Sequence, residues 1–359
     1  MNILRKVNMS DYLNKAKKKL NALREREDYY ILAIESSCDE TAVSVICGRN
    51  ILSNEISSQI QIHKRFGGVV PEIASRNHIL AIDNLVKSAI EKAEITLNDV
   101  EVIAVTYGAG LQGALLVGVS YAKSLAYALN IPVVGIDHIK GHVCANFLAH
   151  KDLKFPFLCL LASGGHTEIL EVNGYSDMKV IGETKDDAAG EAFDKVARVI
   201  GLPYPGGPEI ERHAKNGKNV IPMPRPYKGE DHFNFSYSGI KTAVINYVHN
   251  AEQKKESINT ADVACSFQER AVGMLVENAV TAAKKYGYNT IAVAGGVGAN
   301  SRLREMMTEE CLKNNIKVLL PPKILCTDNG AMIGEAAFFA IKEGIEAADF
   351  SLDANPDLQ

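Results

Sequence analysis

Short blocks of apolar residues, separated by polar or glycine-containing turns, run through most of this chain. The block 29–35 predicts a buried strand that ends in the polar turn 36–41. Alternating apolar and polar side chains after this turn predict two more strands, at 42–46 and around 51–59. The rest of this half is predicted as a helix over 71–93, a strand over 100–106, a small-residue helix after the turn 108–110, and a strand over 131–136.

The same order of elements recurs further along the chain. The predicted elements are strands at 155–162, 168–172 and 179–182, with the polar turn 163–167 after the first, and later a strand at 290–294, the glycine-rich turn 295–300, a helix, and a strand at 316–320. An internal duplication explains this order best, so we expect two α/β lobes. If the lobes face each other across a cleft, their first polar turns would lie on either side of a bound phosphate group. By composition alone, such turns are more often simply tight turns.

A charged helix is predicted near the start of the chain, over residues 8–28. Its apolar residues Leu13, Ala16, Leu20 and Leu23 recur at three- and four-residue spacings and form a thin stripe. The first 28 residues carry eight Lys/Arg and four Asp/Glu, a net charge of +4 that leaves −8 for the rest of a chain whose total is −4. We interpret this segment as an appended, solvated helix in preference to an RNA-binding arm.

Length and composition narrow the class of protein. A chain of 359 residues with 47% hydrophobic residues can form two domains, each with its own core. Its seven cysteines include no Cys-x-x-Cys pair, so reduced thiols are expected. No stretch approaches the roughly 20 apolar residues that cross a bilayer, and the start lacks a signal-peptide core. We therefore expect a cytoplasmic protein with no membrane association. The acidic total gives no overall basic field for nucleic acid.

Two histidines four residues apart follow the strand 131–136. If the chain turns helical after Asp137, His138 and His142 lie on one face and can each offer a ring nitrogen to one metal ion. A third ligand must come from elsewhere, and Asp328, in a polar loop before an apolar helical run, is the best candidate. Because such a pair alone is more often solvated or capping than metal-binding, this interpretation depends on the surrounding sequence.

Eight sequence motifs occur in a fixed order. They are ESSCDETA (35–42), GGVVPEIASR (67–76), HIKGH (138–142), SGGHT (163–167), GGPE (206–209), FSYSGIKTA (235–243), GGVGAN (295–300) and CTDNGAM (326–332). Together they resemble the motifs of the tRNA N6-adenosine threonylcarbamoyltransferase family, formerly labelled O-sialoglycoprotein endopeptidases, and the first and third are most similar to the bacterial branch. The similarity runs from about residue 30 to about residue 344, and the N-terminal segment lies outside it.

This resemblance implies a fold and a reaction. The fold is α/β and actin-like (the ASKHA class), with two duplicated ribonuclease-H-like lobes around a central cleft. We expect a basic helical arm over 1–28, lobe I over 29–137, lobe II over 138–344 and a C-terminal tail over 345–359. The implied enzyme transfers the threonylcarbamoyl group from threonylcarbamoyl-AMP to N6 of the adenosine at tRNA position 37, in tRNAs that read codons beginning with A. AMP is released.

The resemblance also implies a metal site and a donor pocket. One divalent ion, Fe²⁺ or Zn²⁺, would be held by His138, His142 and Asp328, with open positions for a phosphate or carbonyl oxygen. The residues implied around threonylcarbamoyl-AMP are Leu161, Ala162, Ser163, Gly164, Gly165, Asp194, Gly207, Glu211 and Asn300. The catalytic residue is unknown. Glu40 is the first candidate, with Asp39 second, because a carboxylate could accept the proton of the poorly nucleophilic adenine amine.

Several of these residues also have a simpler interpretation. Asn300 fits the cap of the helix that follows it, and Gly207 fits a tight turn. Asp194 stands four residues before Arg198, the spacing of an exposed helix pair. The resemblance moves our interpretation of these residues to donor binding. Ser238 is expected to cap the helix that begins in the motif FSYSGIKTA.

Three other functions compete with this one. Zinc proteolysis of the His-Glu-x-x-His type needs a Glu as general base after the first histidine, and Ile139 stands there. An actin-like ATPase or kinase, the runner-up, would share the lobes without needing a His/His/Asp site. A non-catalytic scaffold, like the degenerate paralogue of this family, is expected to lack that triad.

The resemblance further implies partners. Besides tRNA and threonylcarbamoyl-AMP, they are the degenerate paralogue subunit (TsaB-type) and a small P-loop ATPase subunit (TsaE-type), with a separate synthase that makes the donor. Because the chain is acidic overall, we expect it to bind tRNA weakly by itself, and a partner to supply part of the positive surface.

Overall fold

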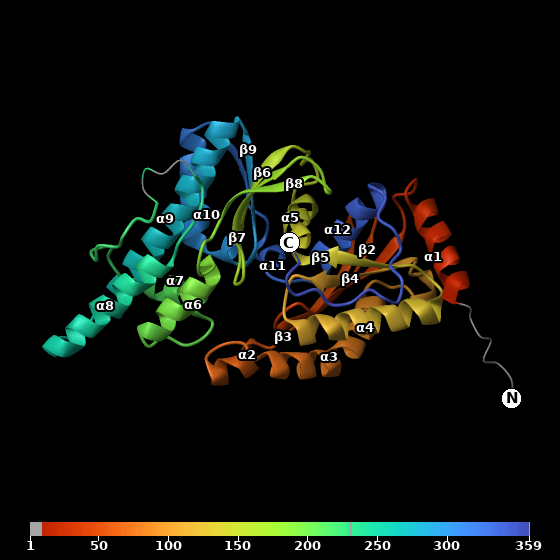
Figure 1. Cartoon of the computed structure of the whole chain (residues 1–359), viewed down its shortest axis with the longest axis horizontal. Helices are drawn as coiled ribbons and strands as arrows, with labels where there is room; N and C mark the ends of the chain where they lie inside the picture. Colours follow the sequence, from red (N-terminus) through yellow and green to blue (C-terminus); the bar gives the residue numbers. More distant parts are fainter. Residues whose placement is uncertain (1–8, 228, 230–231, 359) are drawn as a thin grey trace. The chain divides into compact units, whose positions relative to one another are not determined.

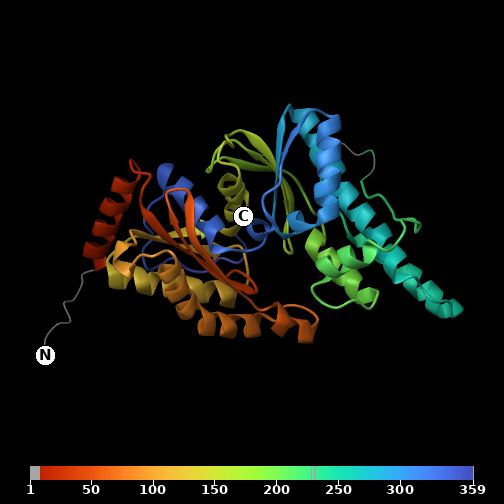
Figure 2. The same ribbon diagram turned by 180° about the vertical axis from the view of Figure 1, so that it is seen from behind.

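The computed structural model describes residues 9–227, 229 and 232–358, which form two compact units. The first unit contains the residues up to Gln59, Val69–Leu148, and the segment from Asp328 onward, and the second contains Ile60–Gly68 and Ala149–Thr327. Figures 1 and 2 show the elements of both units from opposite sides. Residues 1–8 of the predicted N-terminal arm lie outside the described part of the chain.

The first unit is built on a five-stranded sheet with the order β3-β2-β1-β4-β5. The first three strands form an antiparallel meander, and the last two run parallel to β1. The strands are β1 (Tyr30–Glu35), β2 (Glu40–Cys47), β3 (Asn50–Ser58), β4 (Val102–Gly108) and β5 (Val133–Asp137). The helices are α1 (Met9–Leu23), α3 (Pro71–Lys92), the short η2 (Leu97–Asp99), α4 (Gln112–Leu129), α5 (His138–Ala149, whose last residue belongs to the second unit) and α12 (Gly330–Lys342).

Side-chain alternation assigns different helices to the two faces of this sheet. Val43 and Val45 of β2 share an apolar core with residues of α3 and α4. Ser44, which points the other way, lies against α12, so closely that a Cβ on Gly330 would stand 2.6 Å from the Ser44 backbone nitrogen. Because helices cover both faces, the central strand β1 is buried along nearly its whole length.

The second unit repeats this sheet. Its order is β10-β9-β6-β7-β8, again an antiparallel meander followed by two strands parallel to the first. The strands are β6 (Phe157–Ala162), β7 (Thr167–Val172), β8 (Met178–Glu183), β9 (Thr290–Ala294) and β10 (Lys317–Leu319). The helices are α2 (Ile60–His63), η1 (Lys64–Phe66), α6 (Ala189–Val199), α7 (Gly206–Ala214), α8 (Ser238–Lys254), α9 (Thr260–Tyr286), η3 (Gly296–Ala299), α10 (Ser301–Lys313) and α11 (Lys323–Cys326). The predicted duplication is therefore confirmed.

The unit boundaries differ from the expected lobe ranges 29–137 and 138–344. Residues 138–148 and those from Asp328 onward belong to the first unit, because α5 continues directly from β5 and α12 packs on β1 and β2. The chain thus enters the second unit and returns.

The long helix α9 forms the centre of the second core. Its Phe267 packs edge-on against Phe193 of α6, with ring centroids 4.9 Å apart.

The predicted cap of α8 by Ser238 is wrong. The helix starts at Ser238, but the backbone nitrogens of Tyr237 and Ser238 donate to Asp186, at 2.7 and 3.3 Å. Among the described residues, no helix combines the length and apolar character needed to span a bilayer.

Helix α1 is packed, contrary to our interpretation of it as solvated. Of the predicted stripe, Ala16, Leu20 and Leu23 are at most 4% exposed and Leu13 is partly buried, and Tyr12, which was not part of the predicted stripe, is 1% exposed. The Tyr12 hydroxyl donates to the carbonyl oxygen of Ile131 at 2.8 Å, and its ring lies 5.3 Å from that of Phe350, in the segment after α12. The sequence showed the stripe, but its burial depends on chain segments more than a hundred residues away.

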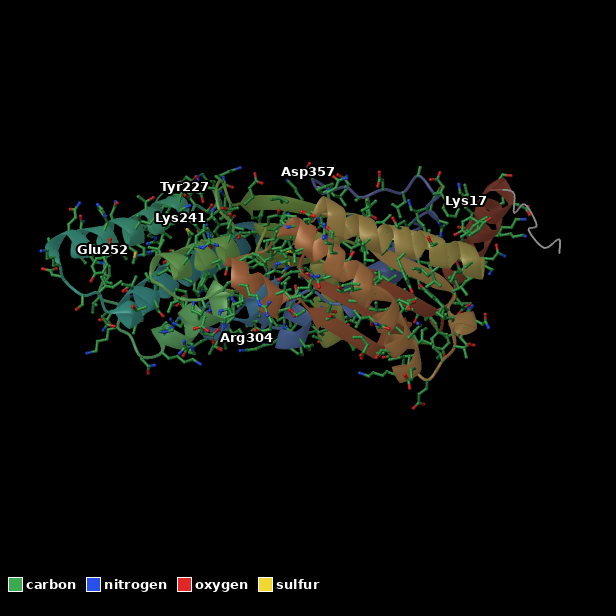
Figure 3. All side chains as sticks on the ribbon, turned by 90° about the horizontal axis from the view of Figure 1, so that it is seen from below. Lys17, Tyr227, Lys241, Glu252, Arg304 and Asp357 are labelled. Carbon is green, nitrogen blue, oxygen red and sulfur yellow. The ribbon has the colours of Figure 1, made fainter. Side chains whose placement is uncertain are left out.

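Charged residues of α1 and the residues after it also make fixed contacts. Lys17 of α1, labelled in Figure 3, forms an ion pair with Glu346 at 3.0 Å. Arg24 donates to the carbonyl oxygen of Gly344 at 2.8 Å, and Lys342 donates to that of Arg24 at 2.9 Å. The basic charge of this helix is therefore used partly for docking within the unit.

We expect Leu20→Ala to weaken the docking of α1 by about 2 to 3 kcal/mol, because it removes a buried side chain and leaves a cavity. Trypsin cleaves undocked helices, so cleavage at the lysines of α1 should accelerate by roughly thirtyfold or more when undocking is fast relative to cleavage. Asn21→Ala, at an exposed position of the same helix, is the matched control and should leave the rate unchanged. Equal rates for the two variants would contradict this docking.

Candidate metal centre and ligand pocket

The junction of β5 and α5 brings two histidines onto one helix face. Asp137, the last residue of β5, accepts hydrogen bonds from the backbone nitrogens of Ile139 and Lys140, at 2.7 and 3.4 Å, and so caps the first turn of α5. One turn separates His138 from His142, and their ring centroids lie 4.6 Å apart. Both imidazoles are buried because α5 is surrounded by protein on nearly all sides.

Asp328 comes from the turn that precedes α12. Asn329 caps this helix by accepting a hydrogen bond from the backbone nitrogen of Met332 at 3.0 Å. The close approach of Gly330 to β2 leaves no room for a side chain there. These two contacts fix the start of α12, and with it the Asp328 carboxylate.

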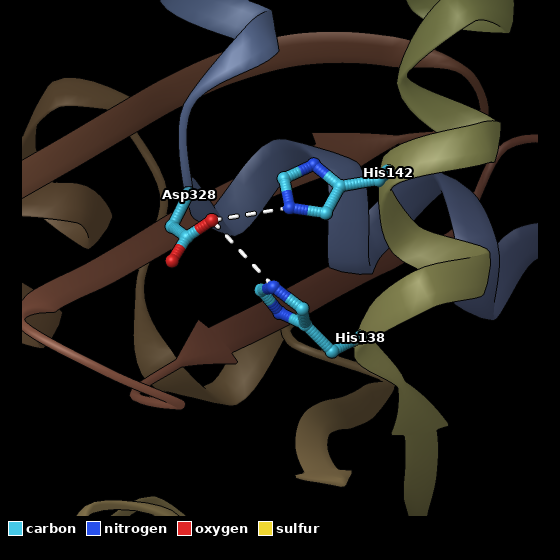
Figure 4. Close-up of side chains that lie close together, drawn as sticks. All are labelled: His138, His142 and Asp328. Atoms are coloured by element: carbon cyan, nitrogen blue, oxygen red, sulfur yellow. Dashed lines mark ion pairs between the residues drawn. The ribbon is translucent and has the colours of Figure 1, made fainter. Parts of the chain in front are cut away.

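The structure brings the three predicted metal ligands together (Figure 4). The Asp328 Oδ1 atom lies 3.2 Å from Nε2 of His142 and 3.6 Å from Nε2 of His138. One ligand atom from each residue lies within 4.8 Å of the others. Because ligands bound at about 2 Å by one tetrahedral ion stand about 3.3 Å from each other, this spacing fits a small divalent cation.

The lack of hydrogen bonds at the His142 ring also fits a metal ligand. Both of its ring nitrogens are buried and make no hydrogen bond with any described residue. The approach of Nε2 to Asp328 is close but lacks hydrogen-bond geometry. A buried polar atom without a partner destabilises a fold by about 1 to 3 kcal/mol, and a metal bond at Nε2 would remove that penalty for this atom.

A buried carboxylate stands on the other side of His138. Oε2 of Glu35, the last residue of β1, lies 3.1 Å from the Nδ1 atom of His138. Burial alone would raise the pKa of Glu35, but the charge and hydrogen bond of His138 lower it. Burial would lower the pKa of His138, but the charges of Glu35 and Asp328 raise it to about 9. The carboxylate and the imidazole therefore stabilise each other's charged forms.

Glu40, the candidate proton acceptor, begins β2 and accepts a hydrogen bond from the Ser58 hydroxyl at 2.9 Å. Its burial, followed by the charges of Asp39 and Asp328, raises the pKa of Glu40 to about 9. A carboxyl group with this pKa is protonated at neutral pH and cannot accept a further proton. This raised pKa is an argument against Glu40 as the general base.

The second unit contains a cavity of about 510 Å³. Five of the predicted donor residues line it: Gly164, Asp194, Gly207, Glu211 and Asn300. At three glycines of the lining, an added Cβ would meet nothing within 4 Å. They are Gly164 and Gly207, which were predicted, and Gly296. Bare backbone therefore faces open space at three places, which allows a ligand to approach closely.

The polar side chains of this cavity are anchored. Asp194 accepts a hydrogen bond from the backbone nitrogen of Gly206 at 2.6 Å, which ties α6 to the start of α7. Asn300 caps α10 by accepting from Leu303 at 3.0 Å, and its amide donates to Gln268 at the same distance. The simpler interpretation of Asn300 as a cap is thus correct, and the residue still borders the cavity.

Four predicted donor residues do not line the cavity. Leu161 and Ala162 are fully buried within β6. Ser163 closes its own turn, because its hydroxyl accepts from the backbone nitrogen of His166 at 3.0 Å. Gly165 is exposed within that turn. These residues belong to the strand and turn that hold Gly164, and they do not form the cavity wall.

Basic residues that the sequence did not single out also line the cavity. They are Arg212, Lys215 and Lys323. A signal for one was present, since Lys215 follows Glu211 by four residues and so shares its helix face. Lys323 comes from a distant short helix, and no spacing in the sequence connects it to the others.

The sequence model of the family TsaD, tRNA N6-adenosine threonylcarbamoyltransferase, matches residues 50–335. Curated relatives with the same name are 55% identical to this chain. The relative from Clostridium perfringens aligns over 92% of this chain and 97% of its own, and the one from Clostridium novyi over 93% and 98%. The chain belongs to this family.

Solved structures with low sequence identity share the fold of this threonylcarbamoyltransferase family member. Full-length HypF, in its phosphate- and nucleotide-bound form, has a TM-score of 0.61 at 17% identity, over 90% of this chain and 48% of HypF. The activator of 2-hydroxyisocaproyl-CoA dehydratase from Clostridium difficile, with bound ADPNP, has a TM-score of 0.50 at 14% identity, over 88% and 96%. The predicted actin-like fold of two duplicated α/β lobes is confirmed.

Proposed function

We propose that the His138, His142 and Asp328 triad and the cavity of the second unit both serve the reaction of this family. The chain is a tRNA N6-adenosine threonylcarbamoyltransferase. It transfers a threonylcarbamoyl group from threonylcarbamoyl-AMP to N6 of the adenosine at tRNA position 37, which forms t6A and releases AMP. Family membership over nearly the whole chain carries this conclusion. It favours the transferase over the ATPase or kinase that was the runner-up from the sequence.

His138, His142 and Asp328 are proposed to hold one divalent metal ion, iron or zinc. The spacing of their ligand atoms supports this, and so does the lack of a hydrogen bond from either ring nitrogen of His142 to a described residue. Two imidazoles and one carboxylate suit either metal. When bound, the ion would supply Lewis-acid chemistry at a phosphate or carbonyl oxygen of the donor. The capped starts of α5 and α12 hold the ligand set in place before a substrate arrives.

The cavity is proposed to bind the adenosine part of the donor. Asp194 and Glu211 offer carboxylates that can accept hydrogen bonds from ribose hydroxyl groups. Lys215 and Lys323 bring positive charge that suits a phosphate. Gly207 offers bare backbone, and Asn300 borders the same space. Leu161, Ala162, Ser163 and Gly165 are proposed to act indirectly, as the strand and turn that hold Gly164.

Glu40 remains our candidate for the group that takes the proton from the adenine amine. This role requires the ionised form, and its raised pKa is the main objection. Part of the rise comes from the negative charge of Asp328, so neutralising that charge would lower the pKa of Glu40.

We also propose that this chain works with two protein partners, a degenerate paralogue subunit and a P-loop ATPase subunit. The net charge of −4 supports a need for help with tRNA, because phosphate contacts depend on clustered Lys and Arg.

His142→Ala and Asp328→Ala are expected to lose the bound metal ion and to lower t6A formation by about 100-fold or more, since each removes one of three ligands. Metal content would be measured on the purified proteins and t6A by mass analysis of tRNA nucleosides. The exposed His249→Ala, on α8, is the control and should change neither quantity. Wild-type t6A formation by Asp328→Ala would instead indicate a scaffold role.

Gly207→Val is expected to lower the affinity for AMP by roughly tenfold or more, because its side chain would occupy the open cavity, and Gly207→Ala should have a smaller effect. Titration calorimetry with AMP measures both. Neighbouring Gly206→Ala should instead lower the free energy of unfolding by about 1 to 3 kcal/mol, since its Cβ would stand 2.6 Å from the Cα atom of Asp194. A folded Gly207→Val protein that binds AMP as tightly as the wild type would refute the pocket assignment.

The isolated chain is expected to bind tRNA more weakly than its complex with the two partner subunits, and to show a shallower dependence of affinity on salt. Fluorescence anisotropy with labelled tRNA, at several matched salt concentrations, measures both properties. Equal affinities and equal slopes would show that this chain alone supplies the positive surface.

A further inference from the structure

Glu35, the first residue of the motif ESSCDETA, is buried next to the metal triad. It is not one of the three proposed metal ligands, and the family resemblance gives it no role. The residue ends β1, the central strand of the first sheet, and is 0% exposed. Two parallel strands bring their ends to the same edge: β4 lies beside β1, where Ile34 pairs with Val105, and β5 lies beside β4, where Thr106 pairs with Ile136. Glu35, Thr106 and His138 therefore meet at the carboxyl ends of three adjacent strands.

Both carboxylate oxygens of Glu35 are held in place. Oε1 accepts a hydrogen bond from the backbone nitrogen of Ser37. Oε2 accepts one from the Thr106 hydroxyl at 2.6 Å and lies 3.1 Å from Nδ1 of His138. The Ser37 hydroxyl is a second neighbour of the same Nδ1 atom, at 3.2 Å. A carboxylate fixed in this way cannot swing to the far side of the imidazole to become a ligand itself.

We propose that Glu35 is a positioning residue that sets the tautomer and ring orientation of His138 for metal binding, an inference that rests on the metal site proposed above. In this arrangement the N–H group at Nδ1 of His138 donates a hydrogen bond to Glu35. The lone pair is then on Nε2, the atom that faces Asp328. The negative charge behind the ring also makes Nε2 a stronger electron donor. His138 would then join the Glu35 carboxylate to the metal ion that the triad would hold.

The second histidine has no such support. Nδ1 of His142 forms no hydrogen bond with a described residue, so its ring is oriented by packing alone. Close packing is available there, because a Cβ on the preceding Gly141 would lie 2.8 Å from the side chain of Ile333 in α12. One ligand is thus oriented electrostatically and the other sterically. Loss of Glu35 should therefore act on the metal site through His138.

The test is zinc affinity of the full-length protein, measured by competition with a chromophoric chelator. Glu35→Gln keeps the size and an acceptor oxygen but removes the charge, and we expect it to weaken Zn²⁺ binding by about 10- to 100-fold. The thermal unfolding of the metal-free proteins would be recorded in parallel, because a purely structural role would change the melting temperature without changing the affinity.

Glu335→Gln is the matched control. Glu335 is also 0% exposed in the first unit, and it is paired with Arg49 at 2.7 Å instead of with a triad residue. This variant should lower the melting temperature and leave the Zn²⁺ affinity within about twofold of the wild type. Equal affinity losses in Glu35→Gln and Glu335→Gln would overturn the positioning role, because any buried carboxylate would then have the same effect.

Glu35→Asp covers the case in which Glu35→Gln does not fold. The shorter side chain keeps the charge but withdraws the carboxylate from Nδ1 of His138, and the same loss of affinity is expected. Unchanged Zn²⁺ affinity in a folded Glu35→Gln or Glu35→Asp protein would overturn the inference while leaving the metal site intact. A wild-type protein that binds no zinc or iron, or a His142→Ala protein that binds zinc as the wild type does, would refute the metal site itself.

Discussion

Buried negative charge at the carboxyl edge of one sheet is the constraint on which the first unit depends. Glu35, Asp39 and Glu40 lie there with Asp328, and the first two are less than 10% exposed. Like charges at such a depth destabilise a fold by several kcal/mol unless protons or cations offset them. The pKa shifts of these carboxyl groups follow from this cost of buried charge. The pKa of Glu40 is raised to about 9, whereas His138 lowers the pKa of Glu35. A cation held by the triad would relieve the same repulsion, so metal binding should be coupled to proton release.

The duplicated sheets use the same edge for different chemistry. In parallel α/β sheets, ligand sites form at the carboxyl ends of the strands, because the chain turns there into loops and helix starts. In the first unit, β1 and β5 end in Glu35 and Asp137, next to imidazoles and carboxylates. In the second unit, β6 and β9 end in turns with bare glycine backbone around a cavity. A charged edge suits a metal ion, and an open, glycine-lined edge suits a nucleoside.

Much of the fold could be predicted, because its elements are short and follow one repeated order. The strands and the helix α3 lie within about two residues of their predicted limits, and the triad came from a pattern of spacing plus family motifs. Predictions failed where the partner is distant in sequence. The cap of α8 is Asp186 and not Ser238, and α1 is docked through Tyr12, which contacts Ile131 and Phe350. Spacing alone cannot reveal such contacts.

Neighbouring glycines show why site residues are harder to predict than elements. Gly206 has no room for a Cβ, because α7 starts against the backbone of α6, whereas Gly207 has open space on the cavity side. The sequence presents them as one Gly-Gly pair before a proline, and it cannot say which serves packing and which faces a ligand. Asn300 adds a second case, since a cap of α10 also borders the cavity. A residue that fixes a helix start is well placed to meet a ligand, because the backbone nitrogens of that first turn point the same way. Capping and binding are therefore compatible roles for one side chain, and a simple structural explanation of a residue does not count against its function.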